Sequence, residues 1–383
     1  ETKYKGDYFF YTNRWVRLNN RSEQVYFGTD SGVAPFDDSD FTNAYPDGVY
    51  WLDRGANFHI YGLNLGDWRF GFQESAVFYN DDFNAEFFFS PMIMYFAQLV
   101  VNGGSKPWNE FSNSKHFMGF FLDKTTDEGY FASQILVDDI NGDILPGVKN
   151  ENQNRLAWSV GGYRNYPFGR VGLFHGGATK HTFAPTYASE KTKSYDTYGE
   201  DQVPVYYSTR PYPYTYYPAV QYDTDDGSMP IDYTQNYIGY KYGESNLSFM
   251  LDYENVFWPQ TSRQLEFYSA LEWVLNGPKS PVNPWHEYDH WRDIPEATEI
   301  LGDGPVEHIV SLRTKVARPV RLFGAPFSLF ADAEVGMAFN AMGLEPAESG
   351  DEDTEPWIYR PQRGEHEPLF QLTLGMSYRW RLK

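Results

Sequence analysis

Apolar and polar positions alternate without a break over the last residues of the chain, 370–383. A period of two indicates a β-strand with one apolar and one polar face. Strands of soluble proteins are typically about 5–6 residues long, whereas a tilted strand that crosses a hydrocarbon layer needs roughly 9–11. The segment therefore predicts a membrane-crossing strand whose arginines line a water-filled lumen. The apolar residues of this alternation are Phe370, Leu372, Leu374, Met376, Tyr378, Trp380 and Leu382.

The same alternation recurs along the chain and predicts an all-β fold, a transmembrane antiparallel up-and-down β-barrel of about 14 strands (range roughly 14–18). We expect a single domain over residues 1–383. Long outer loops are predicted near 28–54, 80–114, 139–154, 184–212, 276–305 and 340–368, with short turns at the opposite end. The one short outer turn is predicted at residues 243–245, in a hairpin that joins the strands 232–242 and 246–256. The predicted strands cover residues 8–27, 55–65, 69–79, 115–123, 130–138, 155–164, 170–183, 213–222, 232–242, 246–256, 263–275, 307–316, 327–339 and 369–383.

Composition agrees with this pattern. The chain holds 31 Tyr, 30 Phe and 11 Trp, which make 19% aromatic residues, although its mean hydropathy is −0.58. Many rings in a hydrophilic chain are typical of alternating strands with aromatic girdles at two membrane interfaces. The longest apolar run, 87–101, is shorter than the roughly 20 residues of a membrane-spanning helix.

Cysteine usage and the start of the chain indicate its compartment. The chain contains no Cys, which excludes disulfides, thiol catalysis and Cys-ligated metal sites. It begins at Glu1 without a start Met, so we expect a mature form whose signal peptide has been cleaved. With the strand pattern, this favours an integral protein of the bacterial outer membrane in contact with outer-membrane lipid. The oligomeric state stays open, and a homo-oligomer is among the alternatives.

Net charge narrows the choice of partners. The formal charge is −21 at pH 7. Such an acidic chain excludes nucleic-acid binding, which needs a basic surface. It favours a surface or pore that attracts cations.

Because side chains alternate between the two faces of a strand, every second residue of the C-terminal strands points away from the apolar face. These residues bring opposite charges to one side of the predicted barrel wall. In a lumen they would set a transverse field that orients polar solutes and selects ions. The alternative is a ladder of cross-strand ion pairs that only stabilises the wall; the two interpretations are compatible. The predicted lumen-lining residues are Asp252, Glu254, Glu266, Glu272, Arg313, Lys315, Asp332, Glu334, Arg379 and Arg381.

Two features of the N-terminal half interrupt the simple pattern. Glu74 occupies one of the alternate positions of the predicted strand 69–79 that are otherwise apolar, and a β-bulge or a position near the rim would explain it. The loop 80–114 is both long and apolar, so it is expected to be functional and to be covered. We predict that it folds into the mouth of the barrel as a constriction or plug.

Several tyrosines and two short motifs are candidate binding sites. The ring-rich segment 206–222 offers flat surfaces for stacking on sugars, although an interfacial girdle uses the same residues. The pattern His286-Glu287-Tyr288-Asp289-His290 matches a zinc-protease signature, yet a solvated aromatic loop is favoured because no third ligand is identified. Residues 138–143 resemble a calcium loop, but a turn is favoured. We expect that the protein is not an enzyme and that it binds no cofactor and no metal ion. The candidates for ligand stacking are Tyr206, Tyr207, Tyr212, Tyr214, Tyr216 and Tyr217.

The N-terminal half resembles a known family. Residues 73–79 (Gln-Glu-Ser-Ala-Val-Phe-Tyr), 90–92 (Ser-Pro-Met), 113–119 and 130–139 (Tyr-Phe-Ala-Ser-Gln-Ile-Leu-Val-Asp-Asp) are similar, in this order, to landmarks of the Wzi family of capsule-assembly outer-membrane barrels. The resemblance covers residues 55–190. It implies a barrel that holds polysaccharide at the cell surface. That family's barrel is larger, and the acidic excess here would repel an anionic capsule.

The sequence thus predicts a porin-like aqueous channel for small polar or cationic solutes, constricted by loop 80–114 and lined by the charged residues named above. The alternative is a Wzi-like barrel that attaches surface polysaccharide. A metalloprotease carried by the loop around His286 and His290 is a third class.

Overall fold

The chain forms one large antiparallel β-sheet. The computed structural model describes residues 1–17, 22–25, 49–52, 54–79, 83, 85–89, 93–94, 114–139, 154–180, 182, 193–198, 201–206, 242–261, 263–278, 298–302, 304–322, 325–346 and 357–378. Within these residues the main sheet has 13 strands. In order across the sheet they are β1 (Thr2–Lys5), β2 (Phe9–Arg17), β5 (Arg54–Leu65), β6 (Trp68–Tyr79), β7 (Ser114–Thr126), β8 (Gly129–Asp139), β9 (Arg155–Tyr166), β10 (Gly169–Ala178), β13 (Asn246–Phe257), β14 (Leu265–Asn276), β15 (Glu307–Leu322), β16 (Ala325–Phe339) and β19 (His366–Tyr378).

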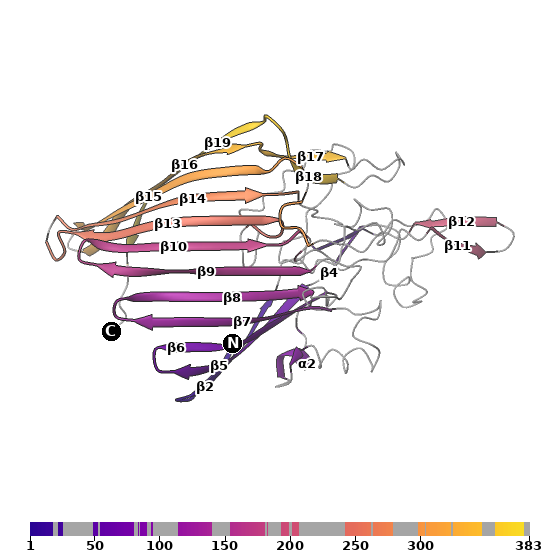
Figure 1. The fold of residues 1–383 in the computed structure, drawn as a ribbon, viewed down its shortest axis with the longest axis horizontal. Helices are drawn as coiled ribbons and strands as arrows, with labels where there is room; N and C mark the ends of the chain where they lie inside the picture. Colours follow the sequence, from indigo (N-terminus) through magenta and orange to yellow (C-terminus); the bar gives the residue numbers. More distant parts are fainter. Residues whose placement is uncertain are drawn as a thin grey trace.

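The topology is up-and-down, because neighbouring strands are antiparallel and follow the order of the chain (Figure 1). At one end the strands are joined by short turns. Between β5 and β6 the turn is Gly66-Asp67, and Gly66 has φ 64°, a left-handed conformation that glycine adopts without steric cost. At the opposite end the strands are joined by long connections, as the sequence predicted.

Small elements lie within these long connections. They are the hairpins β3 (Ser22–Val25) with β4 (Val49–Leu52), β11 (Lys193–Tyr198) with β12 (Asp201–Tyr206) and β17 (Met342–Pro346) with β18 (Trp357–Pro361), and the helix α2 (Ala85–Phe89). All of them lie at the end of the sheet away from the short turns (Figure 1). None of the helices in the described part of the chain is long and apolar enough to span a membrane.

The strand registers divide the sheet into two faces. Residues directly opposite each other on antiparallel strands point to the same face, so a row of register partners can be followed across the sheet. One such row is exposed and entirely apolar, and its face is called the apolar face below. The row consists of Leu173, Leu251, Leu271, Leu312, Val335 and Phe370.

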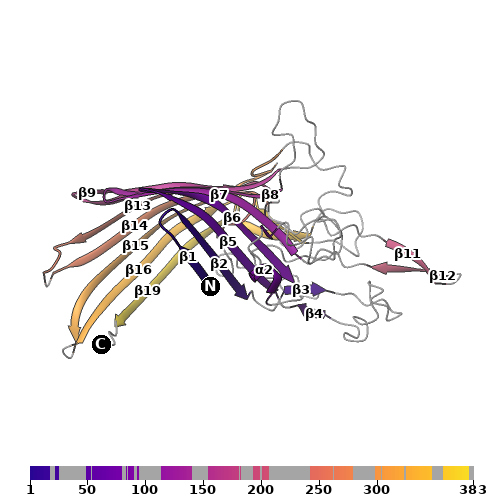
Figure 2. The ribbon, with the colours of Figure 1, turned by 90° about the horizontal axis from the view of Figure 1, so that it is seen from below.

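The opposite face, called the polar face, is the more crowded one. Asp252, Ala270 and Ser311 on this face are buried, whereas their chain neighbours on the apolar face are half-buried or exposed. The sheet is strongly curved, and both of its ends bend to the same side of the central strands β7–β9 (Figure 2). Crowding of this kind is typical of the concave side of a curved sheet. The polar side chains therefore lie on the concave side.

The buried residues do not form an apolar core of the usual kind. Among the described residues, the largest fully buried side chains are Phe117, Met94, His59, Val274, Asn13 and Asn57, and half of these are polar. Large apolar side chains are exposed on the sheet instead. This arrangement is the reverse of a soluble domain, in which exposed apolar patches are small.

The predicted all-β, antiparallel up-and-down architecture is confirmed, with differences in the strands. The described sheet has 13 strands rather than about 14. The predicted strand 8–27 is divided into β2 and β3, the predicted strand 170–183 ends at Ala178, and β1 was not predicted. Among the described residues, β1 and β19 are the two edge strands of the sheet, because β1 pairs only with β2 and β19 pairs only with β16.

The predicted hairpin around residues 243–245 is wrong. β10 pairs with β9 on one side and with β13 on the other, from Arg170 opposite Glu254 to Ala178 opposite Asn246. The predicted strands 213–222 and 232–242 therefore do not lie between β10 and β13. Apart from Tyr242, their residues lie outside the described part of the chain.

Candidate functional site

The polar face carries a continuous belt of charged and tyrosine side chains from β6 to β16, which we call the charged belt. Two register rows carry most of it. The first runs from Tyr163 past Gly172 to Asp252, Ala270, Arg313 and Glu334. The second links Arg170, Glu254, Tyr268, Lys315 and Asp332. The charged belt consists of Arg69, Asp123, Tyr130, Tyr163, Arg170, Asp252, Glu254, Tyr268, Arg313, Lys315, Asp332 and Glu334.

Arg170 connects the two acidic residues of β13 to the neighbouring tyrosine. Its Nη2 forms an ion pair with Glu254 and lies 3.9 Å from Oδ2 of Asp252. Its guanidinium also lies over the ring of Tyr163, 4.7 Å from the ring centroid. Arginine suits this position because its planar group can pair with carboxylates and stack on a ring at once.

Glycine makes room for this group. Gly172 lies directly between Tyr163 and Asp252 in the register row. A Cβ at Gly172 would stand 2.2 Å from Oδ1 of Asp252 and 2.7 Å from the ring of Phe174. The absence of a side chain therefore positions the Asp252 carboxylate against the wall.

A second ion pair lies two strands farther along. Arg313 donates from Nε and Nη2 to the two carboxylate oxygens of Asp332, at 2.9 and 2.7 Å. This geometry is bidentate, which fixes both groups. The direct register partner of Arg313 is Glu334 and that of Asp332 is Lys315, so the pair runs diagonally across the two strands. The Lys315 ammonium lies 5.3 Å from the ring centroid of Phe330.

The belt extends to the N-terminal strands. Arg69 donates to Asp123 at 2.8 Å, and Tyr130 contacts Tyr163 with ring centroids 5.8 Å apart. Acidic groups exceed basic ones on β10 and β13 to β16 of this face, where seven carboxylates (residues 252, 254, 266, 272, 307, 332 and 334) face four cations (residues 170, 313, 315 and 321), an excess of three negative charges. The face is therefore polar, ring-bearing and acidic.

Eight of the ten residues predicted to share one wall are described, and the registers place them on the polar face. They are Asp252, Glu254, Glu266, Glu272, Arg313, Lys315, Asp332 and Glu334. Arg379 and Arg381 lie outside the described residues. Sequence reasoning missed Arg69, Asp123, Tyr163, Arg170 and Tyr268. The sequence signal for Arg170 was present, since it is one position away from Val171 in a strand where Val171 and Leu173 occupy the apolar positions.

The stacking candidates and the loop motifs are not placed by the structure. Tyr206 ends β12, and its side chain is not described. Tyr207, Tyr212, Tyr214, Tyr216 and Tyr217 lie outside the described residues, as do His286 and His290. Within the described part of the chain, no group of three or more His, Asp or Glu residues is placed to hold a metal ion.

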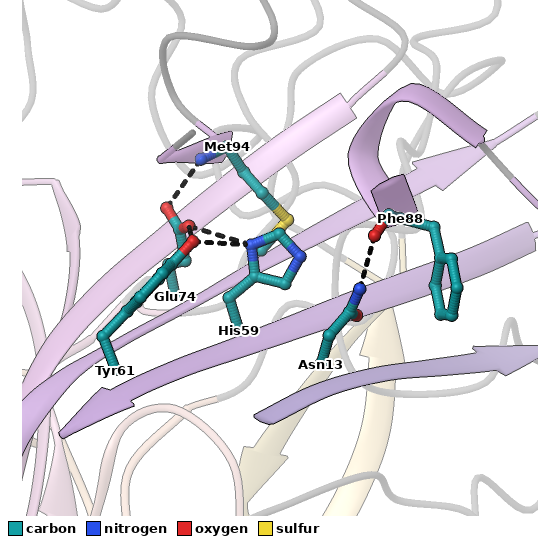
Figure 3. Close-up of polar contacts among 6 residues, drawn as sticks. All are labelled: Asn13, His59, Tyr61, Glu74, Phe88 and Met94. Atoms are coloured by element: carbon teal, nitrogen blue, oxygen red, sulfur yellow. Dashed lines mark hydrogen bonds and ion pairs between the residues drawn. The ribbon is translucent and has the colours of Figure 1, made fainter. Parts of the chain in front are cut away.

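A second polar cluster lies on the apolar face of β2, β5 and β6, about midway along these strands, and Figure 3 shows its side chains. Glu74 accepts a hydrogen bond from the Tyr61 hydroxyl at Oε1, which also lies 3.2 Å from Nδ1 of His59. His59 and Glu74 are buried. The register passes through Glu74 without a shift, so no bulge explains this residue.

Residues of the connection 80–114 cover this cluster. The described ones are Phe83, Ala85–Phe89, Ile93 and Met94. Glu74 Oε2 accepts a hydrogen bond from the Met94 backbone N–H at 2.8 Å. Because Glu74 shares its face with Phe70 and Phe72, this part of the connection contacts the apolar face and does not constrict the polar one. The rest of the connection lies outside the described residues.

No protein-family model matches the chain, and no curated protein matches it. The resemblance to the Wzi family therefore stays a prediction.

Proposed function

We propose that the chain spans a bacterial outer membrane as a β-barrel and forms an aqueous channel for small polar or cationic solutes. The observation that carries the proposal is the division of one curved sheet into an exposed apolar face and a more buried, charged face. In this arrangement the apolar face contacts lipid and the charged belt lines water. The closing contact of the barrel is part of the proposal.

The apolar face supports the membrane assignment by its contiguity. Leu251, Leu271 and Leu312 are direct neighbours on three adjacent strands, and each is exposed. Soluble monomers rarely expose continuous apolar patches of more than a few hundred Å², whereas a barrel wall in lipid needs a continuous apolar band.

Aromatic residues border this band on both sides, as expected for two membrane interfaces. Toward the long connections, Trp158, His175, Phe249, Trp273 and His308 form a row of ring contacts across five strands. Toward the short turns, Phe257 contacts Trp258 and Phe267. The eight residue steps from Phe249 to Phe257 span about 27 Å along the strand, or roughly 20 Å in height at a tilt of about 40°, close to the band of about 25 Å in membrane barrels.

The charged belt supports the choice of solutes. Paired arginines and carboxylates on one wall create a transverse field that orients polar solutes. The excess of carboxylates raises the local concentration of cations. The channel therefore passes cations in preference to anions.

Conductance in a planar bilayer tests the proposal. Under a KCl gradient, we expect steady ohmic current and a reversal potential that reports cation preference. The double variant Asp252→Asn/Glu254→Gln leaves Arg170 unbalanced, and the cation-to-anion permeability ratio should fall by at least about twofold. The control is Asp67→Asn, which removes a carboxylate in the exposed turn between β5 and β6. A protein that inserts into the bilayer and stays electrically silent would contradict the channel.

Attachment of surface polysaccharide is the alternative function. It rests on the family resemblance and on tyrosines whose side chains lie outside the described part of the structure. A silent protein that is retained on immobilised polysaccharide would support it.

A further inference from the structure

The covering segment over β2, β5 and β6 has an unexplained position. We define the strap as the described residues Phe83, Ala85–Phe89, Ile93 and Met94. In both overall views α2 lies beside β2, β5 and β6, near the long connections (Figures 1 and 2). A loop that regulated access to the charged belt would have to lie on the polar face. The strap lies on the other one.

Registers establish the face independently of the pictures. The strap contacts Asn13, Trp15 and Glu74. Asn13 is paired with His59, which is paired with Glu74. Phe72 lies two residues before Glu74 and points to the same face, and its register partner on β7, Phe120, is exposed. All three contacts therefore belong to the apolar face.

Polar side chains hold the backbone of the strap in place. Asn13 donates from Nδ2 to the carbonyl oxygen of Phe88, and Glu74 accepts from the N–H of Met94. These two anchor points, at residues 88 and 94, are six positions apart in the sequence. His59 and Tyr61 orient the Glu74 carboxylate from the neighbouring strand, and the Met94 side chain points toward His59 (Figure 3).

Burial shows why polar residues occupy an apolar face here. Asn13, Asn57, His59 and Glu74 are almost fully buried, so neither water nor lipid reaches them. A polar group without partners is unfavourable in lipid, and the strap supplies backbone partners to two of them. The cluster is therefore a device that fixes the strap to the outside of the wall.

The outward surface of the strap is apolar. Phe89 is 74% exposed and Ile93 is 37% exposed, whereas Met94 between strap and sheet is fully buried. Phe88 and Phe89 contact each other edge to face, and both contact Phe83. The wall beneath would be polar without the strap, and with the strap it presents rings.

We infer that the strap is an interfacial lipid anchor that inserts Phe89 and Ile93 into the outer leaflet, at the boundary between headgroups and acyl chains. The occupant is a lipid surface, because the strap continues the exposed apolar face on which it lies. The strap also lies toward the long connections, at the same end as the aromatic row through Trp158 and Trp273. Short amphipathic segments bind at this depth, about 5–10 Å below the headgroups. This inference rests on the proposed function, since it needs a membrane around the sheet.

Site-directed fluorescence measures the depth of the strap directly. The chain has no native Cys, so one introduced Cys carries one environment-sensitive label. Phe89→Cys and Ile93→Cys are labelled in the full chain, which is reconstituted in vesicles whose lipids carry a quencher either near the headgroup or deep in the acyl chain. Leu251→Cys on β13 is the reference for lipid contact, and Asp67→Cys in the short turn is the reference for water.

We expect the shallow quencher to reduce the fluorescence at positions 89 and 93 at least about twofold more than at position 67, and more than the deep quencher does. Position 251 should respond most to the deep quencher. In the Phe89→Cys background, Glu74→Ala should return position 89 toward the value of position 67, whereas Gln73→Ala, one residue away on the polar face, should leave it unchanged.

The outcomes separate this inference from the proposed function. Quenching at position 251 with none at positions 89 and 93 would overturn the anchor and leave the membrane barrel standing. Absence of quenching at all three positions would overturn both. If unlabelled Phe89→Cys forms disulfide-linked dimers on oxidation and the labelled protein shows no lipid quenching at position 89, the anchor would also be overturned, because the strap would then contact a second copy.

Discussion

Replacing one apolar residue at mid-strand by arginine distinguishes a lipid-facing sheet from a water-facing one. Leu372 lies six residues from each end of β19, about 20 Å along the strand, and its side chain is 52% exposed on the apolar face. If this face contacts lipid, position 372 is close to the membrane midplane. There an arginine costs about 2–4 kcal/mol of unfolding free energy, or roughly one and a half to three powers of ten in the folding equilibrium.

Gln371 supplies the matched control. It is the preceding residue of β19, is exposed, and lies on the polar face opposite Glu334. An arginine there meets a carboxylate in a watery environment, so Gln371→Arg should change stability by less than about 1 kcal/mol in either direction. The same residue type is thus introduced on the two faces, one residue apart.

The assay is reversible urea unfolding of both variants from phospholipid vesicles, followed by tryptophan fluorescence. We expect Leu372→Arg to lose about 2–4 kcal/mol and Gln371→Arg to stay within about 1 kcal/mol. If the apolar face is in water, Leu372→Arg is an ordinary surface substitution and changes stability by no more than about 0.5 kcal/mol. Equal and small effects at both positions would refute the assignment of the faces.

Three further predictions concern the wall itself. Arg313→Gln removes the bidentate contact with Asp332. Because Arg313 is exposed, the free energy of unfolding should fall by less than about 1 kcal/mol, while reversal potentials in bilayers should show a stronger preference for cations. A loss of stability with unchanged ion selectivity would instead make the pair purely structural. Gly172→Ala places a methyl group 2.2 Å from Asp252 Oδ1 and should cost about 1–3 kcal/mol in urea unfolding; a neutral effect would mean that the carboxylate moves freely. Trp158→Phe removes the hydrogen bond to His175 Nε2, 3.0 Å long, and should cost about 0.5–1.5 kcal/mol by thermal unfolding in vesicles; an unchanged midpoint would show that this contact adds nothing.

Side-chain alternation made the faces predictable from the sequence. In β14 the residues Leu265, Phe267, Leu271 and Trp273 and the intervening Glu266 and Glu272 lie on the predicted sides, because a period of two requires only local geometry. The charged residues of β13 to β16 therefore fall on one face without any knowledge of neighbouring strands.

Strand pairing was less predictable because a turn signal fixes only a local reversal. Residues 243–245 carry such a signal, and Gly243 and Ser245 have positive φ values of 63° and 49°. The chain does turn there, but β13 finds its partner in β10. The N–H of Ser245 bonds to the carbonyl of Thr179, just after β10, which is a contact between residues far apart in the sequence.

The strap cluster shows how a break in alternation can carry information. Glu74 breaks the pattern of strand 69–79, and the sequence offered a bulge or a rim position as its cause. The structure shows a third cause, since the carboxylate binds the backbone of a segment that follows later in the chain. The identity of that partner depends on tertiary contacts, which the strand pattern does not encode.

Solvent accessibility of single cysteines along β14 tests the two-faced sheet most directly. Each residue from 266 to 273 is replaced in turn by Cys in the otherwise Cys-free chain, and its reaction with a water-soluble, membrane-impermeant thiol reagent is followed in vesicles. We expect reaction at positions 266, 268 and 272, slower reaction at the buried position 270, and protection at 267, 269, 271 and 273. Equal reaction rates on both parities, or faster reaction at 267, 269, 271 and 273, would contradict this expectation.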